Sequence, residues 1–235
     1  MTPYLAEFIG TLLLMVLGNG VNANVSLRKT FGEGSGWMVI SLGWGLAVFV
    51  AVFVAGSVSG AHINPAVTLG LAITGKFSWA QVPGYILAQM IGAFSGAFLT
   101  YLQYRPHFTE TDDPEVKLGL FSTGPAIKST FNNFLSEVIG TFILVYCVFF
   151  LVSGNGLGSL SALPVGLLVV AIGLSLGGTT GYAINPARDL GPRIFHAVAP
   201  IKGKRDSNWK YAWIPVIGPM VGAGLAGVAY LLIPT

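Results

Sequence analysis

Long apolar runs alternate with short polar segments along this chain. Five intervals contain no Asp, Glu, Lys or Arg, and they are residues 8–27, 34–75, 77–104, 138–187 and 211–235. A helix needs about 20 apolar residues to cross a bilayer, so the two longest intervals have room left over after their spanning helices. The pattern predicts six spanning helices, at about 4–26, 37–56, 81–103, 133–153, 161–179 and 211–232.

Two copies of the tripeptide Asn-Pro-Ala lie inside these apolar intervals, at residues 64–66 and 185–187. Asn is a preferred helix N-cap and Pro is preferred at the first helical position, so each tripeptide starts a new helix. The segments that begin there, about 64–75 and 185–197, are too short to cross a membrane alone. The sequence therefore predicts two re-entrant half-helices inside the membrane, which is typical of a pore.

Composition places the chain in a bilayer. Hydrophobic residues make up 53% of it and charged residues 9%, whereas a soluble domain carries about 25% charge. The single cysteine, Cys147, excludes an intramolecular disulfide framework and a cysteine-based metal cluster. Basic residues are spread over the loops, so no nucleic-acid partner is expected. No cofactor and no metal site are expected either.

An internal repeat divides the chain. Residues 6–11 (AEFIGT) reappear as residues 136–141 (SEVIGT), and an Asn-Pro-Ala follows each copy. Each half holds three predicted crossings, so the second half enters from the opposite side, as in inverted-repeat transport proteins. We expect one transmembrane channel domain, 1–235, whose halves and linker are about 1–104, 133–235 and 105–132.

Residues 59–68 (SGAHINPAVT) and 181–189 (GYAINPARD) resemble the paired signatures of the aquaporin family of major intrinsic proteins, in its glycerol-facilitator (aquaglyceroporin) branch. The resemblance covers essentially the whole chain. It implies an all-α integral membrane fold of six transmembrane helices and two re-entrant half-helices. It also implies a homotetramer with one pore per subunit. The function implied is passive conduction of glycerol, other small uncharged solutes and water, with protons and ions excluded.

The half-helices and their loops supply candidate pore residues. If the two half-helix N-termini meet at the midplane, their partial positive charges form a barrier to cations. Asn64 and Asn185 would donate their amides into the lumen there. By the resemblance, Glu7 and Glu137 brace the loops before the half-helices, because irregular backbone in a membrane needs internal partners. His62 resembles a pore-lining position, and a role as a buried core group stays open.

The resemblance assigns the selectivity filter to Trp44, Gly173, Tyr182 and Arg188. Arg188 would repel cations and donate to substrate hydroxyls. Gly173 leaves space for a carbon backbone, and Trp44 and Tyr182 form an apolar corner opposite Arg188. Tyr182 replaces the Phe of a typical glycerol facilitator, and whether its hydroxyl narrows or polarises the slot stays open. Asp189 is expected to anchor a loop rather than to touch substrate.

The remaining aromatic and histidine residues have simpler interpretations. Trp and Tyr are favoured at membrane interfaces, so four tryptophans near predicted span ends are expected there: Trp37, Trp79, Trp209 and Trp213. His107 and His196 lack metal-ligand spacing and are expected to be loop or surface groups.

Three alternatives to a glycerol channel stay open. One is a water-selective channel. Another is an intramembrane enzyme using Glu7, Glu137 or His62, which would need two titratable groups close together, whereas the repeat places the two glutamates in opposite halves. The third is a structural membrane protein with a closed pore. Large residues at position 173 or after each Asn-Pro would favour it, and none is present.

Orientation brings two rules into conflict. The family has both termini in the cytoplasm, so the loops near 27–36, 104–132 and 198–210 would be outside. Those loops hold most of the basic residues, and the positive-inside rule therefore favours the opposite orientation. We follow the resemblance and expect a multi-pass protein of a bacterial plasma membrane with both termini cytoplasmic.

Overall fold

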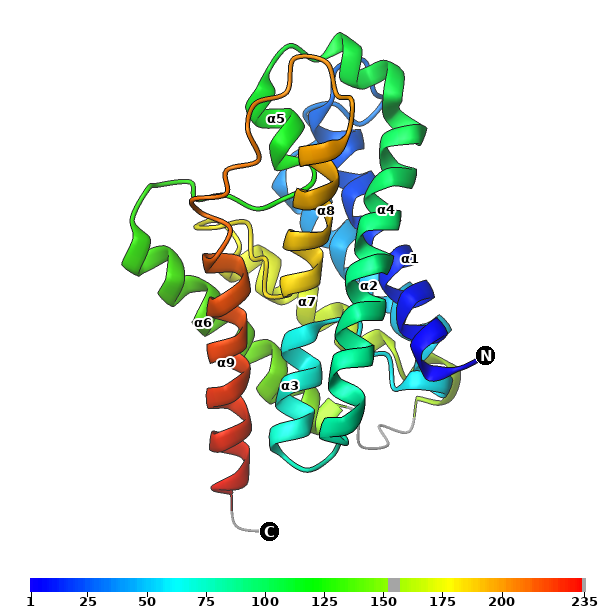
Figure 1. The fold of residues 1–235 in the computed structure, drawn as a ribbon, viewed down its shortest axis with the longest axis vertical. Helices are drawn as coiled ribbons and strands as arrows, with labels where there is room; N and C mark the ends of the chain where they lie inside the picture. The colour runs from blue at the N-terminus through cyan, green and yellow to red at the C-terminus, as the bar shows by residue number, and fades with distance from the viewer. Residues whose placement is uncertain (152–156, 234–235) are drawn as a thin grey trace.

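The computed structural model describes residues 1–151 and 157–233, and in those ranges every regular element is a helix (Figure 1). The elements are α1 (Pro3–Ser26), α2 (Trp37–Ser59), α3 (Pro65–Ile73), η1 (Trp79–Gln81), α4 (Val82–Glu110), α5 (Pro114–Gly119), α6 (Thr130–Leu151), η2 (Gly158–Leu160), α7 (Leu163–Leu176), α8 (Pro186–Val198) and α9 (Ile214–Leu231). The predicted all-α architecture is confirmed for this part of the chain.

Five of the described helices are long and apolar enough to cross a membrane: α1, α2, α4 with the turn before it, α6 and α9. The fifth predicted span, about 161–179, is shorter in the structure. Helix α7 has 14 residues, a length of about 21 Å, against a hydrocarbon thickness of about 30 Å. It ends before residues 177–180 (GGTT), which are poor helix formers and lead into the loop before α8.

The third span runs further than predicted. Helix α4 continues to Glu110 and contains Pro106, whereas the sequence predicts an end near residue 103. Packing outweighs the unfavourable proline, because Phe108 in this extension stacks on the ring of Phe121 with centroids 5.6 Å apart. The segment predicted as a linker, 105–132, therefore contains the end of α4 and all of α5.

Both half-helices begin at their Asn-Pro-Ala tripeptide. The side-chain oxygen of Asn64 accepts a hydrogen bond from Ala66 N at 2.8 Å, and that of Asn185 accepts from Ala187 N at 3.0 Å. Proline fills the first helical position of α3 and of α8, where its missing N–H leaves no helix bond unmade. The predicted half-helices are confirmed.

The two halves pack in the same way. A Cβ added to Gly92 on α4 would stand 2.5 Å from the carbonyl oxygen of Phe8 on α1. The matching position on α9, Gly222, would place a Cβ 2.4 Å from the carbonyl oxygen of Val138 on α6. Glycine at both positions lets the helix backbones touch. The pairs α1 with α4 and α6 with α9 are thus the equivalent supports of the inverted repeat.

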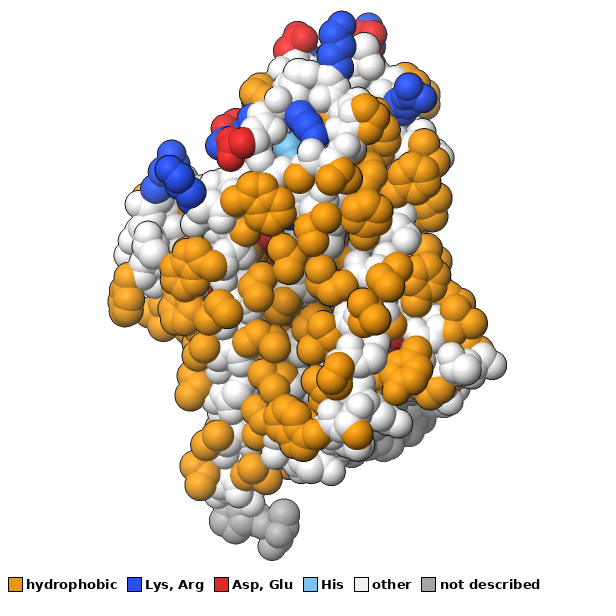
Figure 2. Space-filling view, viewed as in Figure 1, with side chains coloured by type: hydrophobic (Ala, Val, Ile, Leu, Met, Phe, Trp, Pro, Cys, Tyr) orange, Lys and Arg blue, Asp and Glu red, His pale blue; other side chains and the backbone are white. Residues whose placement is uncertain are grey.

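Most of the exposed charge lies toward one end of the molecule. Figure 2 shows apolar side chains over most of the visible face, with Lys, Arg, Asp and Glu gathered at the end of the long axis that carries α5. The N-terminus and the end of α9 lie in the opposite half (Figure 1). An apolar belt with one charged end fits a protein embedded in a bilayer.

Candidate functional site

A cavity of about 880 Å³ runs between the two halves and is lined by residues from both. Its walls include Trp44, His62, Asn64, Tyr182, Asn185 and Arg188. Of the four predicted filter residues, Gly173 is the one whose atoms are not part of this wall. The fold therefore brings most of the predicted pore residues to the wall of one cavity.

The half-helices are joined at their N-termini by reciprocal hydrogen bonds. Asn64 Nδ2 donates to the carbonyl oxygen of Ile184 at 2.8 Å, and Asn185 Nδ2 donates to that of Ile63 at 2.9 Å. A side-chain amide has two N–H donors, so each asparagine keeps one for the lumen. The sequence does not predict this exchange, because it links residues more than a hundred positions apart.

The loops before the half-helices are held in strained backbone conformations. Four non-glycine residues have positive φ, between 38° and 47°: Ala61, Ile63, Tyr182 and Ile184. Such conformations persist only where the surroundings fix them. The same alternation in both loops turns the carbonyls of Ile63 and Ile184 toward the opposite half.

Glu7 supplies the fixed partner of the first loop. It is fully buried, and its Oε1 accepts from His62 N at 2.8 Å and its Oε2 from Ile63 N at 2.7 Å. The side chains of Ser59 and Gln89 also donate to this carboxylate, at 2.7 and 2.8 Å. All four donors point at one carboxylate, which faces the loop.

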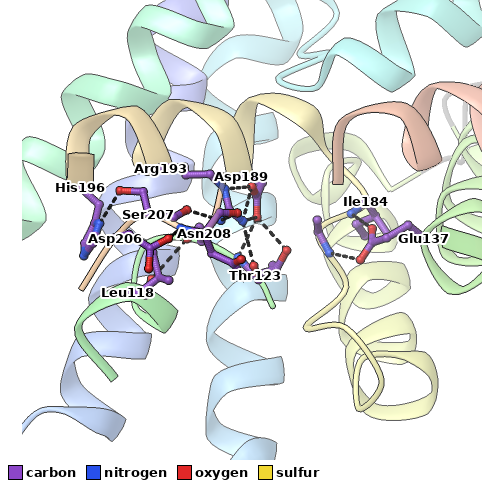
Figure 3. Close-up of polar contacts among 12 residues, drawn as sticks. Leu118, Thr123, Glu137, Ile184, Asp189, Arg193, His196, Asp206, Ser207 and Asn208 are labelled. Atoms are coloured by element: carbon purple, nitrogen blue, oxygen red, sulfur yellow. Dashed lines mark hydrogen bonds and ion pairs between the residues drawn. The ribbon is translucent and has the colours of Figure 1, made fainter. Parts of the chain in front are cut away.

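Glu137 occupies the equivalent place behind the second loop (Figure 3). Its Oε1 accepts from Ala183 N at 3.0 Å and from Thr180 Oγ1 at 2.7 Å. Its Oε2 accepts from Ile184 N at 2.8 Å. The two carboxylates thus belong to separate hydrogen-bond networks, one in each half.

We expect Glu137→Gln to destabilise the folded channel. A glutamine turns an NH2 group toward backbone donors, and each buried donor left unpaired costs about 1–3 kcal/mol. Unfolding in mixed micelles, followed by tryptophan fluorescence, measures the loss. Glu110→Gln is the matched control, because that glutamate is exposed and pairs with Lys29 at the surface. Equal stability of the two variants would contradict a bracing role for Glu137.

Arg188 lies on the face of Trp44. Its Cζ is 4.0 Å from the centre of the indole ring, a cation–π distance. From the sequence we expect Trp44 opposite Arg188, but the structure places the two in contact. Among the described residues, none accepts a hydrogen bond from the Arg188 guanidinium, and its buried Nη1 has no partner. This charge is therefore available to a molecule in the cavity.

Tyr182 occupies the space that Gly173 opens. A Cβ on residue 173 would stand 3.0 Å from the Tyr182 hydroxyl and from Ser41 Oγ. The prediction that this space is open to solute is therefore wrong, because the phenol ring of the neighbouring loop fills it. The hydroxyl is buried, and Tyr182 forms part of the cavity wall.

Trp37 supports the same corner and is missed by sequence reasoning. Its Nε1 donates to the carbonyl oxygen of Gly173 at 2.9 Å, and its ring meets Tyr182 edge to face at 5.7 Å. The Trp37 side chain is also partly exposed, so one face of it is consistent with the predicted position at the membrane interface. Nothing local in the sequence distinguishes Trp37 from Trp79, which is exposed.

Asp189 and Arg193 form a fully buried ion pair on α8 (Figure 3). Asp189 Oδ2 also accepts from the backbone N and the hydroxyl of Thr123, both at 2.7 Å. Arg193 donates to the carbonyl oxygens of Thr123 at 2.8 Å and Ser207 at 2.7 Å. The pair ties α8 to the linker and to the loop before α9. The spacing of four residues on a helix is the signal that could have identified Arg193.

His196 lies in the same network, and its predicted surface position is wrong. The side chain is fully buried, and its Nδ1 is 2.8 Å from Ser207 Oγ. Nearby, Lys204 Nζ donates to the carbonyl oxygens of His196, Ala197 and Ala199, which end helix α8. A lysine at a helix C-terminus is favourable because it meets unpaired carbonyls. His107, by contrast, is partly exposed and contacts the carbonyl oxygen of Arg28.

His62 presents a hydrogen-bond acceptor to its surroundings. Its Nδ1 is 3.1 Å from Thr68 Oγ1, which donates its own proton to Asn64 O and accepts from Gln89 Nε2. With the Thr68 proton on Asn64 O, Nδ1 donates to Thr68 and Nε2 of a neutral ring is left as the acceptor. The ring packs against Phe77 and lines the cavity.

Comparisons with known proteins agree over the whole chain. The family model described as major intrinsic protein matches residues 1–230. A probable glycerol uptake facilitator protein of Thermotoga maritima is 57% identical over 98% of this chain and 98% of its own length. The glycerol uptake facilitator protein of Bacillus subtilis is 57% identical over 98% of this chain and 84% of its own. The X-ray structure of the aquaglyceroporin from Plasmodium falciparum superposes with a TM-score of 0.87 at 35% identity, covering 98% and 95% of the two chains.

Proposed function

Since this chain belongs to the major intrinsic protein family, we propose that it is a passive membrane channel for glycerol and other small uncharged solutes, with water. The predicted family and channel class are confirmed, and with them the prediction that the protein is not an enzyme. One observation carries the choice of solute. An unpaired guanidinium lies on an indole face in the wall of a passage between two half-helices.

That arrangement suits a polyol. Hydroxyl oxygens of a solute accept from Arg188, while its CH groups lie against the rings of Trp44 and Tyr182. Further along the passage, Asn64 and Asn185 each offer the amide hydrogen that the opposite half does not use. His62 then offers an acceptor. Hydrogen-bond donors to the solute oxygens thus alternate with apolar parts of the cavity wall. A few placed polar groups in an apolar site fix the orientation of a small molecule.

Two positive features oppose cations. The N-termini of α3 and α8 meet at the reciprocal asparagine bonds, and each carries about half an elementary charge. Arg188 adds a full charge that no described acid neutralises by a direct ion pair. Protons and metal cations therefore meet a barrier where a neutral solute does not.

The remaining roles follow from the contacts. We assign Glu7 and Glu137 to bracing of the two loops, and Asp189 to anchoring of α8 against Thr123. Gly173 acts through Tyr182, by giving its ring a place to pack. Trp44, Tyr182 and Arg188 touch the solute.

The protein functions as a multi-pass homotetramer of a bacterial plasma membrane, with both termini cytoplasmic. Bacterial relatives and the exposed apolar helix faces support this part of the proposal. Basic side chains at the charged end are held by local partners there, as Lys29 is by Glu110 and Arg205 is by Glu115 and Asp206.

Stopped-flow light scattering on proteoliposomes tests the function. Vesicles with the protein should re-swell in a glycerol gradient faster than empty vesicles, and should also shrink faster in a sucrose gradient. No acceleration of glycerol entry would refute the polyol channel.

A water-selective channel is the second candidate, because Tyr182 fills the space beside Gly173. A narrower passage passes water and excludes a three-carbon solute. Fast water flow without glycerol entry in the same vesicles would favour this candidate.

We expect Arg188→Val to admit cations. The substitution removes the fixed charge and leaves the face of Trp44 uncovered, so both the electrostatic barrier and the steric limit decrease. Proton entry into vesicles loaded with a pH-sensitive dye should rise well above that of the original protein. Lys76→Met serves as a control, because Lys76 also lines the cavity but contacts Tyr230. Proton entry equal to that of the original protein would remove the barrier role from Arg188.

A further inference from the structure

Asn22 lies directly behind the filter tryptophan. It is buried on α1, and its Oδ1 accepts from Trp44 Nε1 at 3.0 Å. Its Nδ2 donates to the carbonyl oxygen of Leu120 in the linker at 3.2 Å. One side-chain amide therefore connects the filter to the segment that joins the two halves.

This is the only described hydrogen bond of the Trp44 side chain. The other contacts of its ring are apolar or electrostatic. A Cβ on Gly18, one turn before Asn22, would stand 2.4 Å from the indole, so α1 presses on the ring edge. The Arg188 guanidinium covers its face. The indole ring is thus contacted by α1 at its edge and by Arg188 on its face, and its N–H makes one hydrogen bond, to Asn22.

We propose that Asn22 is a positioning residue for the filter, which sets the orientation of Trp44 and thereby the ratio of glycerol to water permeability. The inference rests on the proposed function. A buried indole N–H needs an acceptor, and Asn22 fixes where that acceptor lies. Arg188 follows the ring because it stacks on it. The amide therefore controls two of the three side chains that touch the solute.

The linker takes part in the same control. Leu120 O accepts the second bond of Asn22. Three residues later, Thr123 N donates to Asp189 and Thr123 O accepts from Arg193, both on α8. The linker thus contacts the supports of Trp44 on one side and of Arg188 on the other.

The test compares permeability ratios in proteoliposomes. One buried hydrogen bond is equivalent to about a fivefold preference for one side-chain position, so Asn22→Leu should lower the glycerol-to-water ratio about fivefold. Asn19→Leu is the matched control, because Asn19 is buried one turn away on α1 and both its amide atoms lack a partner among the described residues. Its ratio should equal that of the original protein.

A double substitution separates positioning from general support. In a Trp44→Phe background the indole N–H is absent, so adding Asn22→Leu should change the ratio no further. An equal fivefold change in that background would overturn the proposal, as would an unchanged ratio in Asn22→Leu alone.

If Asn22→Leu does not fold, Asn22→Gln provides a second test. It keeps the amide one methylene further out and should still shift the glycerol-to-water ratio; an unchanged ratio there overturns the proposal too. Absence of glycerol flux in the original protein is a separate result, and it refutes the proposed function.

Discussion

Arg193→Met should lose about 3–5 kcal/mol of unfolding free energy, because it leaves the carboxylate of Asp189 buried without its partner. The ion pair is fully buried on both sides. The same arginine also donates to two loop carbonyls, so the loop before α9 loses one of its attachments to α8. Unfolding in mixed micelles at fixed lipid content measures the change.

Two further variants identify the cause of that loss. Adding Asp189→Asn to Arg193→Met removes the unpaired charge and keeps an oxygen that accepts from Thr123, so part of the stability should return. Arg205→Met removes an arginine from exposed ion pairs, and such pairs contribute about 0–1 kcal/mol. If Arg193→Met and Arg205→Met unfold at the same denaturant concentration, the buried pair does not hold α8.

The second large effect is expected from Gly173→His, which should abolish most glycerol conduction. Even a Cβ at this position would lie 3.0 Å from Tyr182 and Ser41, and an imidazole needs far more room. The Tyr182 ring must then move toward the cavity, where it narrows the slot. Water, which is smaller, should still pass, so the glycerol-to-water ratio should fall at least tenfold in the stopped-flow assay.

A glycine near the end of the same helix provides the control for Gly173→His. Gly178→Ala lies just beyond the end of the same helix, and a Cβ there meets no atom within 4 Å. Its ratio should match that of the original protein. Gly173→Ala should show a smaller shift in the same direction as Gly173→His. An unchanged glycerol-to-water ratio in both Gly173 variants would contradict the proposal that this glycine gives the Tyr182 ring its place to pack.

The half-helices could be predicted because their start signal is local. In each Asn-Pro-Ala tripeptide the Asn side chain caps the helix that the following Pro begins. The repeat then identified Glu7 and Glu137 as equivalent residues before their contacts were known. These parts of the site are encoded in short segments or in a comparison of one half with the other.

Features that depend on packing across the two halves were not predictable. The length of α7, the seat of Tyr182 and the burial of His196 are set by neighbours distant in sequence. Trp37 looks like an interfacial tryptophan, and only the fold brings Gly173 to its indole N–H. Asn22 has no motif around it, and its role follows from where Leu120 and Trp44 meet it.

The reciprocal asparagine bonds determine when the pore is completed during synthesis. Asn64 has its acceptor at Ile184, and Ile63 receives its donor from Asn185. Each bond joins residues about 120 positions apart, so the first half-helix is synthesised well before the partner of its bond. Until then, the amide of Asn64 and the carbonyl of Ile63 must be satisfied by water or by the insertion machinery, because lipid offers them nothing. Because each bond needs one residue from each half, the junction between the half-helices can form only after the second half has been synthesised.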